Sequence, residues 1–235
     1  MTLRRLLTCI SSVSSSNALT APTIEQIKQG KWAVRSSIKS VKTDFAHKVL
    51  IVVGDGAEVL DTMGPYYRLG EDYQVVIAAP EVDSYHLVIH ELDVGWDITR
   101  ERPGYRIESD IAFKDINPDG YVALVLPGGR APEYIRYDQD LIRVTRAFFE
   151  KNKPVASICH GIEILATAGV IKGRKVTTIP KCRFDATACG GVYVTDPVVQ
   201  DGNLICARGK KDISAWMKQF AKMIKEHICP TQKQK

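Results

Sequence analysis

The chain has 235 residues, of which 45% are hydrophobic and 25% are charged, a composition typical of a globular protein with one substantial core. The sequence has no run of 18 apolar residues, so we expect neither a membrane-spanning helix nor a membrane partner. Its six cysteines form no C-x-x-C pair, which argues against a disulfide scaffold and against the usual zinc fingers.

The net charge of +5 lies entirely in the N-terminal segment. Residues 1–46 hold seven of the 32 basic residues and two of the 27 acidic ones, so the remaining 189 residues carry 25 charges of each sign. A domain without net charge lacks the basic surface of a nucleic-acid binder. We therefore expect no nucleic-acid partner.

The first 24 residues contain two arginines, a cluster of serines and no acidic residue. This composition is typical of a transit peptide for mitochondria or another organelle, and the alternative is a tail without function in a cytoplasmic protein. The predicted organisation is a basic, partly disordered leader over residues 1–46, a folded domain over 47–229 and a short tail over 230–235.

Short apolar runs alternate with amphipathic stretches from residue 47 onward. The pattern predicts strands over residues 48–53, 73–79, 121–126 and 155–158, and helices over 58–69, 141–150, 162–170 and 213–227. Continuous apolar strands that alternate with helices indicate a parallel sheet covered on both faces. The sequence therefore predicts an α/β fold.

Residues 81–110 are less regular, and we interpret them as a surface excursion. His86, His90 and Glu91 invite a metal hypothesis, but their spacing does not match a helical zinc motif. Hydrogen-bonded histidines are the expected alternative. We expect no metal and no cofactor.

The segment PVASICHGIEIL (154–165) places a cysteine where a buried strand changes into a helix. The strand ends at Ile158, Cys159 lies in the turn, and Gly161 permits a sharp entry into the helix. This arrangement resembles a nucleophile elbow, which presents its side chain at the carboxyl edge of the sheet. The helix N-terminus favours a thiolate, and His160 is adjacent for proton transfer. The alternative is a small buried apolar side chain, as most free cysteines are.

The same segment, together with LVLPGGRAPEYIR (124–136), resembles the DJ-1/PfpI superfamily and its PfpI-type branch. KVLIVVGDGAEVLDTMGPYYRL is similar to that family's first strand and helix, and GRKVTTIP and DGNLICAR to later segments. The resemblance covers roughly residues 47–227. It implies a flavodoxin-like three-layer sandwich with a mostly parallel central sheet, related in fold to class I glutamine amidotransferases.

The resemblance also implies a set of site residues. Cys159 matches the nucleophile, His160 the adjacent histidine, and Glu133 a glutamate that acts from a neighbouring subunit. Asp61 matches an acidic residue near the thiol, although the family has the longer glutamate there. The backbone N–H groups of Gly129 and His160 match the oxyanion hole. The alternatives are that Asp61 is a solvated charge and that Glu133 lies in the first turn of a helix over residues 133–150.

The resemblance implies a cysteine-dependent enzyme that attacks small reactive carbonyls, as a glyoxalase III-type lyase, a deglycase or a PfpI-type hydrolase. It also implies a homo-oligomer, a dimer or a hexamer, in which Glu133 crosses the interface. A redox-sensing, stress-protective chaperone that uses oxidation of Cys159 is the alternative. A glutamine amidotransferase is disfavoured, because the only histidine after His160 is His227, near the C-terminus.

Overall fold

A computed structural model describes residues 37–39 and 45–230 of the chain. Most of the segment interpreted as a leader, and residues 231–235 of the tail, lie outside the described residues, so the transit peptide stays a prediction. Within that segment, Ser37–Ile38 form strand β1, which pairs with β6 (Arg100–Glu108). Pairing with the folded domain therefore begins before residue 47.

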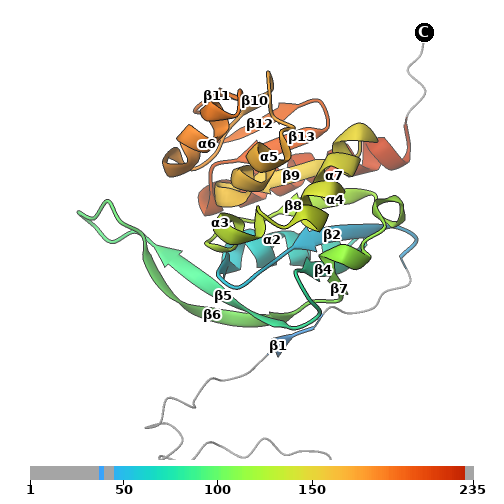
Figure 1. Ribbon diagram of the computed structural model, residues 1–235, viewed down its shortest axis with the longest axis horizontal. Helices are drawn as coiled ribbons and strands as arrows, with labels where there is room; N and C mark the ends of the chain where they lie inside the picture. Colours follow the sequence, from blue (N-terminus) through green and yellow to red (C-terminus); the bar gives the residue numbers. More distant parts are fainter. Residues whose placement is uncertain (1–36, 40–44, 231–235) are drawn as a thin grey trace, which may run out of the picture. The chain divides into compact units, whose positions relative to one another are not determined.

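The central sheet has seven strands, and all neighbours in it are parallel except β12 and β13. Their order across the sheet is β12 (Val198–Asp201), β13 (Leu204–Ala207), β9 (Val155–Ile158), β8 (Ala123–Leu126), β2 (Lys48–Val52), β4 (Gln74–Ala79) and β7 (Ile111–Ala112). Leu50 of β2 lies opposite Leu124 of β8 and Val76 of β4. The expected α/β fold with a mostly parallel sheet is confirmed (Figure 1).

Helices cover both faces of this sheet (Figure 1). Helices α2 (Val59–Gly70) and α7 (Ile213–Ile228) pack together on one face, and α3 (Ala131–Ile135), α4 (Gln139–Glu150) and α5 (Ile162–Ala168) lie on the other. Helix α6 (Arg183–Ala188) follows, and a small parallel pair is formed by β10 (Lys175–Val176) and β11 (Val192–Tyr193). Short 3₁₀ turns span Phe113–Asp115, Pro118–Gly120, Cys159–Gly161, Pro180–Cys182 and Lys210–Asp212. None of the helices within residues 45–230 has the length and apolar character that crossing a lipid bilayer requires.

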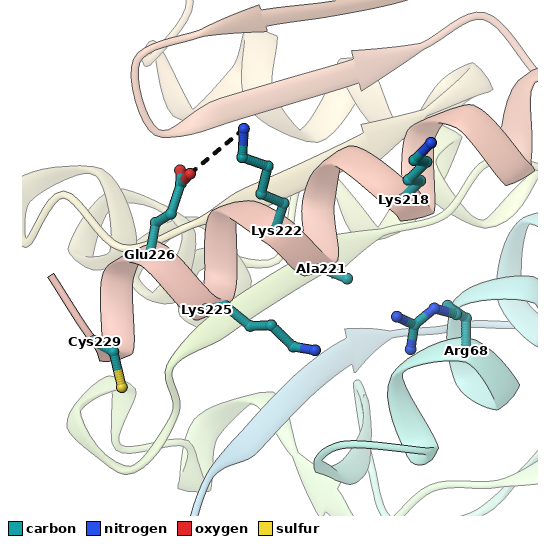
Figure 2. A pocket seen from close by; sticks show the side chains of 7 residues that line it. All are labelled: Arg68, Lys218, Ala221, Lys222, Lys225, Glu226 and Cys229. Atoms are coloured by element: carbon teal, nitrogen blue, oxygen red, sulfur yellow. Dashed lines mark ion pairs between the residues drawn. The ribbon is translucent and has the colours of Figure 1, made fainter. Parts of the chain in front are cut away.

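Helices α2 and α7 leave a groove of about 450 Å³ between their C-terminal halves (Figure 2). Arg68 lines it from α2, and Lys218, Lys222 and Lys225 line it from α7; Figure 2 shows the Lys225 and Arg68 side chains extending toward each other. Most of these cations already have acidic partners: Lys222 pairs with Glu226, and Arg68 and Lys225 both pair with Asp72. The groove lies about two turns along α2 from Asp61, so it is separate from the cysteine site.

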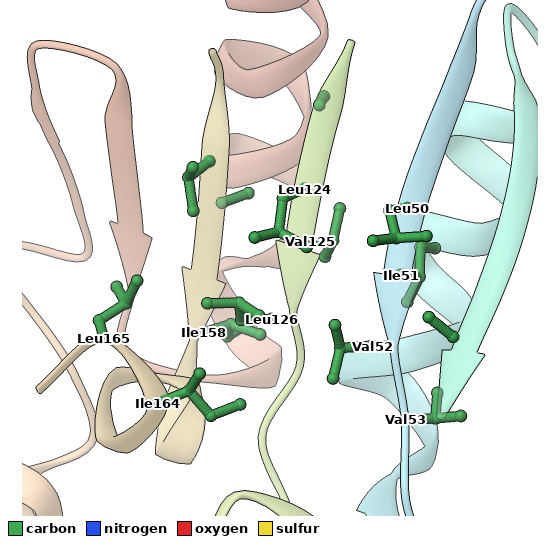
Figure 3. Packing of buried hydrophobic residues seen from close by; sticks show 14 of the residues in the cluster. Leu50, Ile51, Val52, Val53, Leu124, Val125, Leu126, Ile158, Ile164 and Leu165 are labelled. Carbon is green, nitrogen blue, oxygen red and sulfur yellow. The ribbon is translucent and has the colours of Figure 1, made fainter. Parts of the chain in front are cut away.

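The core is built on the apolar runs of the central strands (Figure 3). Figure 3 shows Leu50, Ile51, Leu124 and Val125 from β2 and β8 beside Ile158 of β9. All five are fully buried. Because each side chain of this kind contributes about 1.5–3 kcal/mol when buried, these strands form a rigid platform for the loops at their carboxyl ends.

Several helix ends differ from those predicted. Helix α4 begins two residues before the expected start at 141, because the Asp138 side chain accepts from the N–H groups of Asp140 and Leu141 and caps it. The alternative of one helix over 133–150 is wrong, because α3 ends before this cap. Helix α5 ends at Gly169, whose φ of +73° closes the helix, and does not continue to residue 170.

The segment 81–110 is not irregular. β5 (Ser84–Glu91) and β6 form an antiparallel hairpin in a second sheet, of order β1-β6-β5-β3, where β3 is Ala57–Glu58. The two histidines lie on β5: His86 contacts Asp55, and His90 contacts Glu101. The hairpin was not predicted because Pro103 and a register shift after His86 interrupt its pattern.

Candidate active site

Cys159 lies in a strained turn between β9 and α5. Its φ is +54°, a left-handed conformation that costs a residue with a side chain about 1–3 kcal/mol. The Thr178 hydroxyl donates to the Cys159 carbonyl and fixes the turn. The side chain is only 6% exposed. The turn therefore holds the sulfur in one place, just beneath the surface.

Three groups surround the sulfur. The Cys159 Sγ lies 3.2 Å from Nδ1 of His160, and the backbone N–H groups of Gly129 and His160 interact with the sulfur. These are the two amides that the resemblance places in an oxyanion hole. The structure thus brings the thiol, the imidazole and both amide donors together.

Burial raises the pKa of Cys159 above that of a free thiol, and the nearby Asp61 carboxylate raises it further. The two amides lower this pKa, in the direction that the helix N-terminus predicts, but burial outweighs them. Burial therefore favours the thiol form of Cys159 in the resting protein.

His160 is positioned to accept the thiol proton. Burial, with smaller contributions from His90, Arg130 and Lys181, lowers the pKa of His160 to about 4, whereas Asp185 acts in the opposite direction. The imidazole is therefore neutral at neutral pH. A neutral imidazole with its proton on Nε2 presents an acceptor, Nδ1, to the thiol.

Asp61 is 1% exposed in the first turn of α2, so the interpretation as a solvated charge is wrong. Burial raises the pKa of Asp61 well above its ordinary value, and the neighbouring Glu58 carboxylate adds to this; the Gly128 amide, Lys210 and Cys159 act in the opposite direction. Neither carboxyl oxygen of Asp61 lies within ordinary hydrogen-bond geometry of a partner among the described residues. Burial therefore favours the protonated, neutral form of this carboxyl group.

The protonation of Asp61 makes the protein less stable as the pH rises. Above its ordinary pKa of 3.8 the unfolded state releases this proton while the folded state keeps it, so the free energy of unfolding falls until the folded pKa is reached. The variant Asp61→Asn lacks this loss and should gain stability relative to the parent between about pH 4 and about pH 8. Urea unfolding at both pH values measures it, with the exposed Asp97→Asn as the control. An Asp61→Asn effect that is the same at both pH values contradicts the assignment.

The loop after β8 fits tightly over the sulfur. Gly129 has a φ of +90° and bridges to Ala57, while the Glu58 N–H donates to the Gly128 carbonyl over 3.1 Å. A Cβ on Gly128 would lie 2.5 Å from the Cys159 Cβ and 2.7 Å from an Asp61 oxygen. Only a residue without a side chain lets this loop bring its amides to the thiol.

Glu133 lies in the short helix α3. Its carboxylate forms a 3.0 Å ion pair with Nε of Arg130, and both side chains are largely exposed. Among the described residues, the structure does not bring Glu133 into contact with His160. Its predicted role across an interface stays a prediction.

Four further residues near the site were not predicted as functional. Glu58 caps α2 and accepts from the Asp61 N–H over 2.8 Å, and the His90 ring lies edge-on to His160 at 6.5 Å between centroids. Glu163 and Cys182 place ligand atoms within 4.8 Å of one of the His160 nitrogens. The spacing of Glu58 before Asp61 and of Glu163 after His160 is readable in the sequence, whereas His90 and Cys182 come from distant segments.

Comparisons with known proteins agree with this architecture. The sequence profile of the DJ-1/PfpI family matches residues 47–223. A protein named as a deglycase from Thermococcus kodakarensis is 40% identical over 179 residues, which cover 76% of this chain and 99% of that protein. Deglycase PfpI of Pyrococcus furiosus is 37% identical with the same coverage.

Solved structures share the fold at lower identity. A ThiJ/PfpI domain protein from Brachyspira murdochii has a TM-score of 0.66 at 14% identity, covering 78% of this chain and 99% of that one. Schizosaccharomyces pombe DJ-1 has a TM-score of 0.61 at 18% identity, covering 80% of this chain and 100% of that one. With the profile match and the 40% identity, these comparisons show that the chain belongs to the DJ-1/PfpI family.

Proposed function

We propose that the protein is a cysteine-dependent deglycase that acts on small reactive carbonyl compounds, such as methylglyoxal, and on their early adducts with amines. The observation that carries this proposal is the 3.2 Å contact between the Cys159 Sγ and His160 Nδ1, with the Gly129 and His160 amides on the same sulfur. Relatives that cover this chain's domain are named deglycases. A buried sulfur under a tight loop favours a small substrate over a folded protein.

In the first step, the sulfur adds to the carbonyl carbon while His160 Nδ1 takes the thiol proton. A carbon–sulfur bond forms, and the electron pair of the carbonyl moves to its oxygen. The amides of Gly129 and His160 lie beside the sulfur and donate to this oxygen. Donors of this kind contribute about 3–4 kcal/mol to catalysis when they are fixed in advance.

In the second step, the adduct rearranges. For methylglyoxal, the carbon bound to sulfur loses its proton and the neighbouring ketone carbon gains one, which gives a lactoyl thioester. Water then releases lactate and restores the thiol, so the net reaction adds one water molecule to the aldehyde. An early amine adduct is a hemiaminal, and there the sulfur bonds to the carbon that carries the hydroxyl while the bond from that carbon to nitrogen breaks. The amine leaves with the thiol proton that His160 has taken, and the resulting hemithioacetal rearranges as above.

Asp61 supports the charged form of the sulfur. As a protonated carboxyl it carries no negative charge, so it no longer raises the pKa of Cys159, and its O–H is available as a donor to the sulfur. Burial thus supports the reaction, because it raises the pKa of Asp61 and favours the form that carries this proton.

A substrate panel tests the proposal. The full-length protein is incubated with methylglyoxal, with a peptide glycated by methylglyoxal and with a fluorogenic peptidase substrate. We expect lactate from the first two and no cleavage of the third. Peptide cleavage without lactate formation would overturn the proposal in favour of a peptidase.

The structure does not favour a redox sensor. Sensor cysteines are exposed and ionised, because peroxide attacks the thiolate. Cys159 is 6% exposed, and burial raises the pKa of its thiol. Attack on a carbonyl requires neither an exposed sulfur nor a thiolate before the substrate binds.

We further propose that Glu133 acts on His160 of a second subunit in a homo-oligomer. The Glu133 carboxylate is exposed and pairs with Arg130 of the loop after β8. The pKa of His160 is lowered to about 4, mainly by burial, so a carboxylate beside the His160 Nε2 would raise this pKa and make the imidazole a stronger base. The variant Glu133→Gln should reduce kcat about 10²-fold or more without changing the melting temperature. Steady-state kinetics and sedimentation measure this, with Glu150→Gln on exposed α4 as the control. A fully active monomer would contradict the proposal.

A further inference from the structure

His160 forms a cluster with two side chains, Glu163 and Cys182, that have no part in the proposed reaction. Ligand atoms of His160, Glu163 and Cys182 all lie within 4.8 Å of one another. His160 and Glu163 are three residues apart where α5 begins, so they point to the same side. Cys182 comes from the 3₁₀ turn Pro180–Cys182, which packs over them. The cluster therefore joins one nitrogen, one oxygen and one sulfur donor.

The cluster is buried and incompletely satisfied. Glu163 is 6% exposed and Cys182 is 2% exposed. The Cys182 thiol donates to Glu163 Oε1 over a long 3.5 Å, and Glu163 Oε2 has no hydrogen-bond partner among the described residues. Most buried polar atoms in proteins make a hydrogen bond, so a buried carboxylate oxygen held only by a 3.4 Å ion pair with Arg136 keeps a lone pair available to a ligand.

Arg136 is the nearest cation to this carboxylate, at 3.4 Å from Oε2. Its guanidinium has better partners elsewhere: it lies 3.0 Å from Asp185 and donates to the Thr167 hydroxyl over 2.8 Å. Glu163 is therefore free to turn toward His160 and Cys182 without leaving the arginine unpaired.

The three donors are those that zinc prefers. Imidazole nitrogen, thiolate sulfur and carboxylate oxygen bind Zn²⁺ at about 2.0–2.3 Å, which places tetrahedral ligands about 3.3–3.8 Å apart. The three ligand atoms, which lie within 4.8 Å of one another, have to approach by only about 1 Å to reach this spacing. Three protein ligands leave a fourth position for water, as in other accessible zinc sites.

We propose that His160, Glu163 and Cys182 form a site for Zn²⁺, and that the bound ion inhibits the enzyme. On binding, a zinc–sulfur bond forms at Cys182, and the thiol proton passes to the solvent. The ion occupies a nitrogen of His160 and turns the imidazole away from the proton of Cys159. Inhibition rests on the proposed function, whereas metal binding does not.

Cobalt(II) is the probe, because a thiolate ligand to Co²⁺ gives a charge-transfer absorption that is independent of catalysis. Cobalt chloride is titrated into full-length protein and into the variants Cys182→Ser, Glu163→Gln, Cys159→Ala and, as the control, the exposed Cys189→Ser. We expect the thiolate band in the parent, Cys159→Ala and Cys189→Ser, and its loss in Cys182→Ser. Glu163→Gln should keep the band and lower the affinity at least about tenfold.

Three results would overturn the site: no band in the parent, a band that survives in Cys182→Ser, or a band that disappears in Cys159→Ala. The inhibition is measured as the ratio of methylglyoxal turnover with and without zinc chloride in the parent, Cys182→Ser and Cys189→Ser. We expect Cys182→Ser to need at least about tenfold more zinc than Cys189→Ser for the same ratio. Equal zinc sensitivity of the two variants would overturn the proposed inhibition. If the parent protein does not turn over methylglyoxal, the proposed function is refuted, and the cobalt absorption band still tests the metal site.

Discussion

Replacement of Cys159 by alanine is expected to reduce kcat/KM for methylglyoxal by at least about a thousandfold, because it removes the sulfur that lies between His160 and the two amides. The variant keeps the imidazole, the amides and the buried Asp61, so any remaining rate measures what these groups achieve without a nucleophile. Lactate formation in the presence of excess methylglyoxal measures the effect.

Two controls separate chemistry from folding. The variant Cys189→Ala removes an exposed sulfur and should keep full turnover. The melting temperature of Cys159→Ala should change little, because alanine fills most of the same space in the turn. An unchanged rate in Cys159→Ala would remove Cys159 from the mechanism.

The variant Gly129→Ala is expected to lose several kcal/mol of stability. At a φ of +90° an alanine costs about 1–3 kcal/mol, and the added Cβ would lie 2.2 Å from the Gly56 carbonyl oxygen and 2.4 Å from the Glu58 nitrogen. Both neighbours are backbone atoms held by the bridge to β3, so they cannot move aside as a flexible side chain can. Overpacking of this kind costs about 1–3 kcal/mol more.

Urea unfolding measures this loss, with Gly70→Ala as the matched control. Gly70 ends α2, and a Cβ there would meet nothing within 4 Å, so that variant should be neutral or more stable by about 0.5–1 kcal/mol. If Gly129→Ala unfolds at the same urea concentration as the parent, the loop does not have the tight packing described above. Turnover should fall with stability, since the Gly129 amide belongs to the site.

The central sheet could be predicted from the sequence because its strands are continuous apolar runs. The predicted strand over residues 155–158 matches β9, and the run over 48–53 matches β2 to within one residue. The hairpin of β5 and β6 could not be predicted in this way, because its residues are half-exposed and polar, and Pro103 interrupts β6. Its pairing with β1 and β3 depends on segments distant in the sequence.

The site was predictable to the extent that its residues are neighbours in sequence. Cys159 and His160 are adjacent, and their position between a buried strand and a helix predicts a nucleophile with a neighbouring base. The direction of the Cys159 pKa shift was not predictable, because it depends on burial by the loop at Gly128, by α2 and by the 3₁₀ turn before α6. The contact between His90 and His160 was not predictable either, because it depends on the hairpin that carries His90.

The two residues of β3 have a consequence for how movements spread through the molecule. Ala57 pairs with Leu87 of the hairpin and bridges to Gly129 of the site loop, while Glu58 caps the helix that carries Asp61. One dipeptide therefore connects the outer hairpin, the amide donor and the buried acid, without the seven-stranded sheet as an intermediary. A partner that displaces the hairpin by a fraction of an ångström would alter the surroundings of the sulfur directly, while the rigid platform beneath stays unchanged.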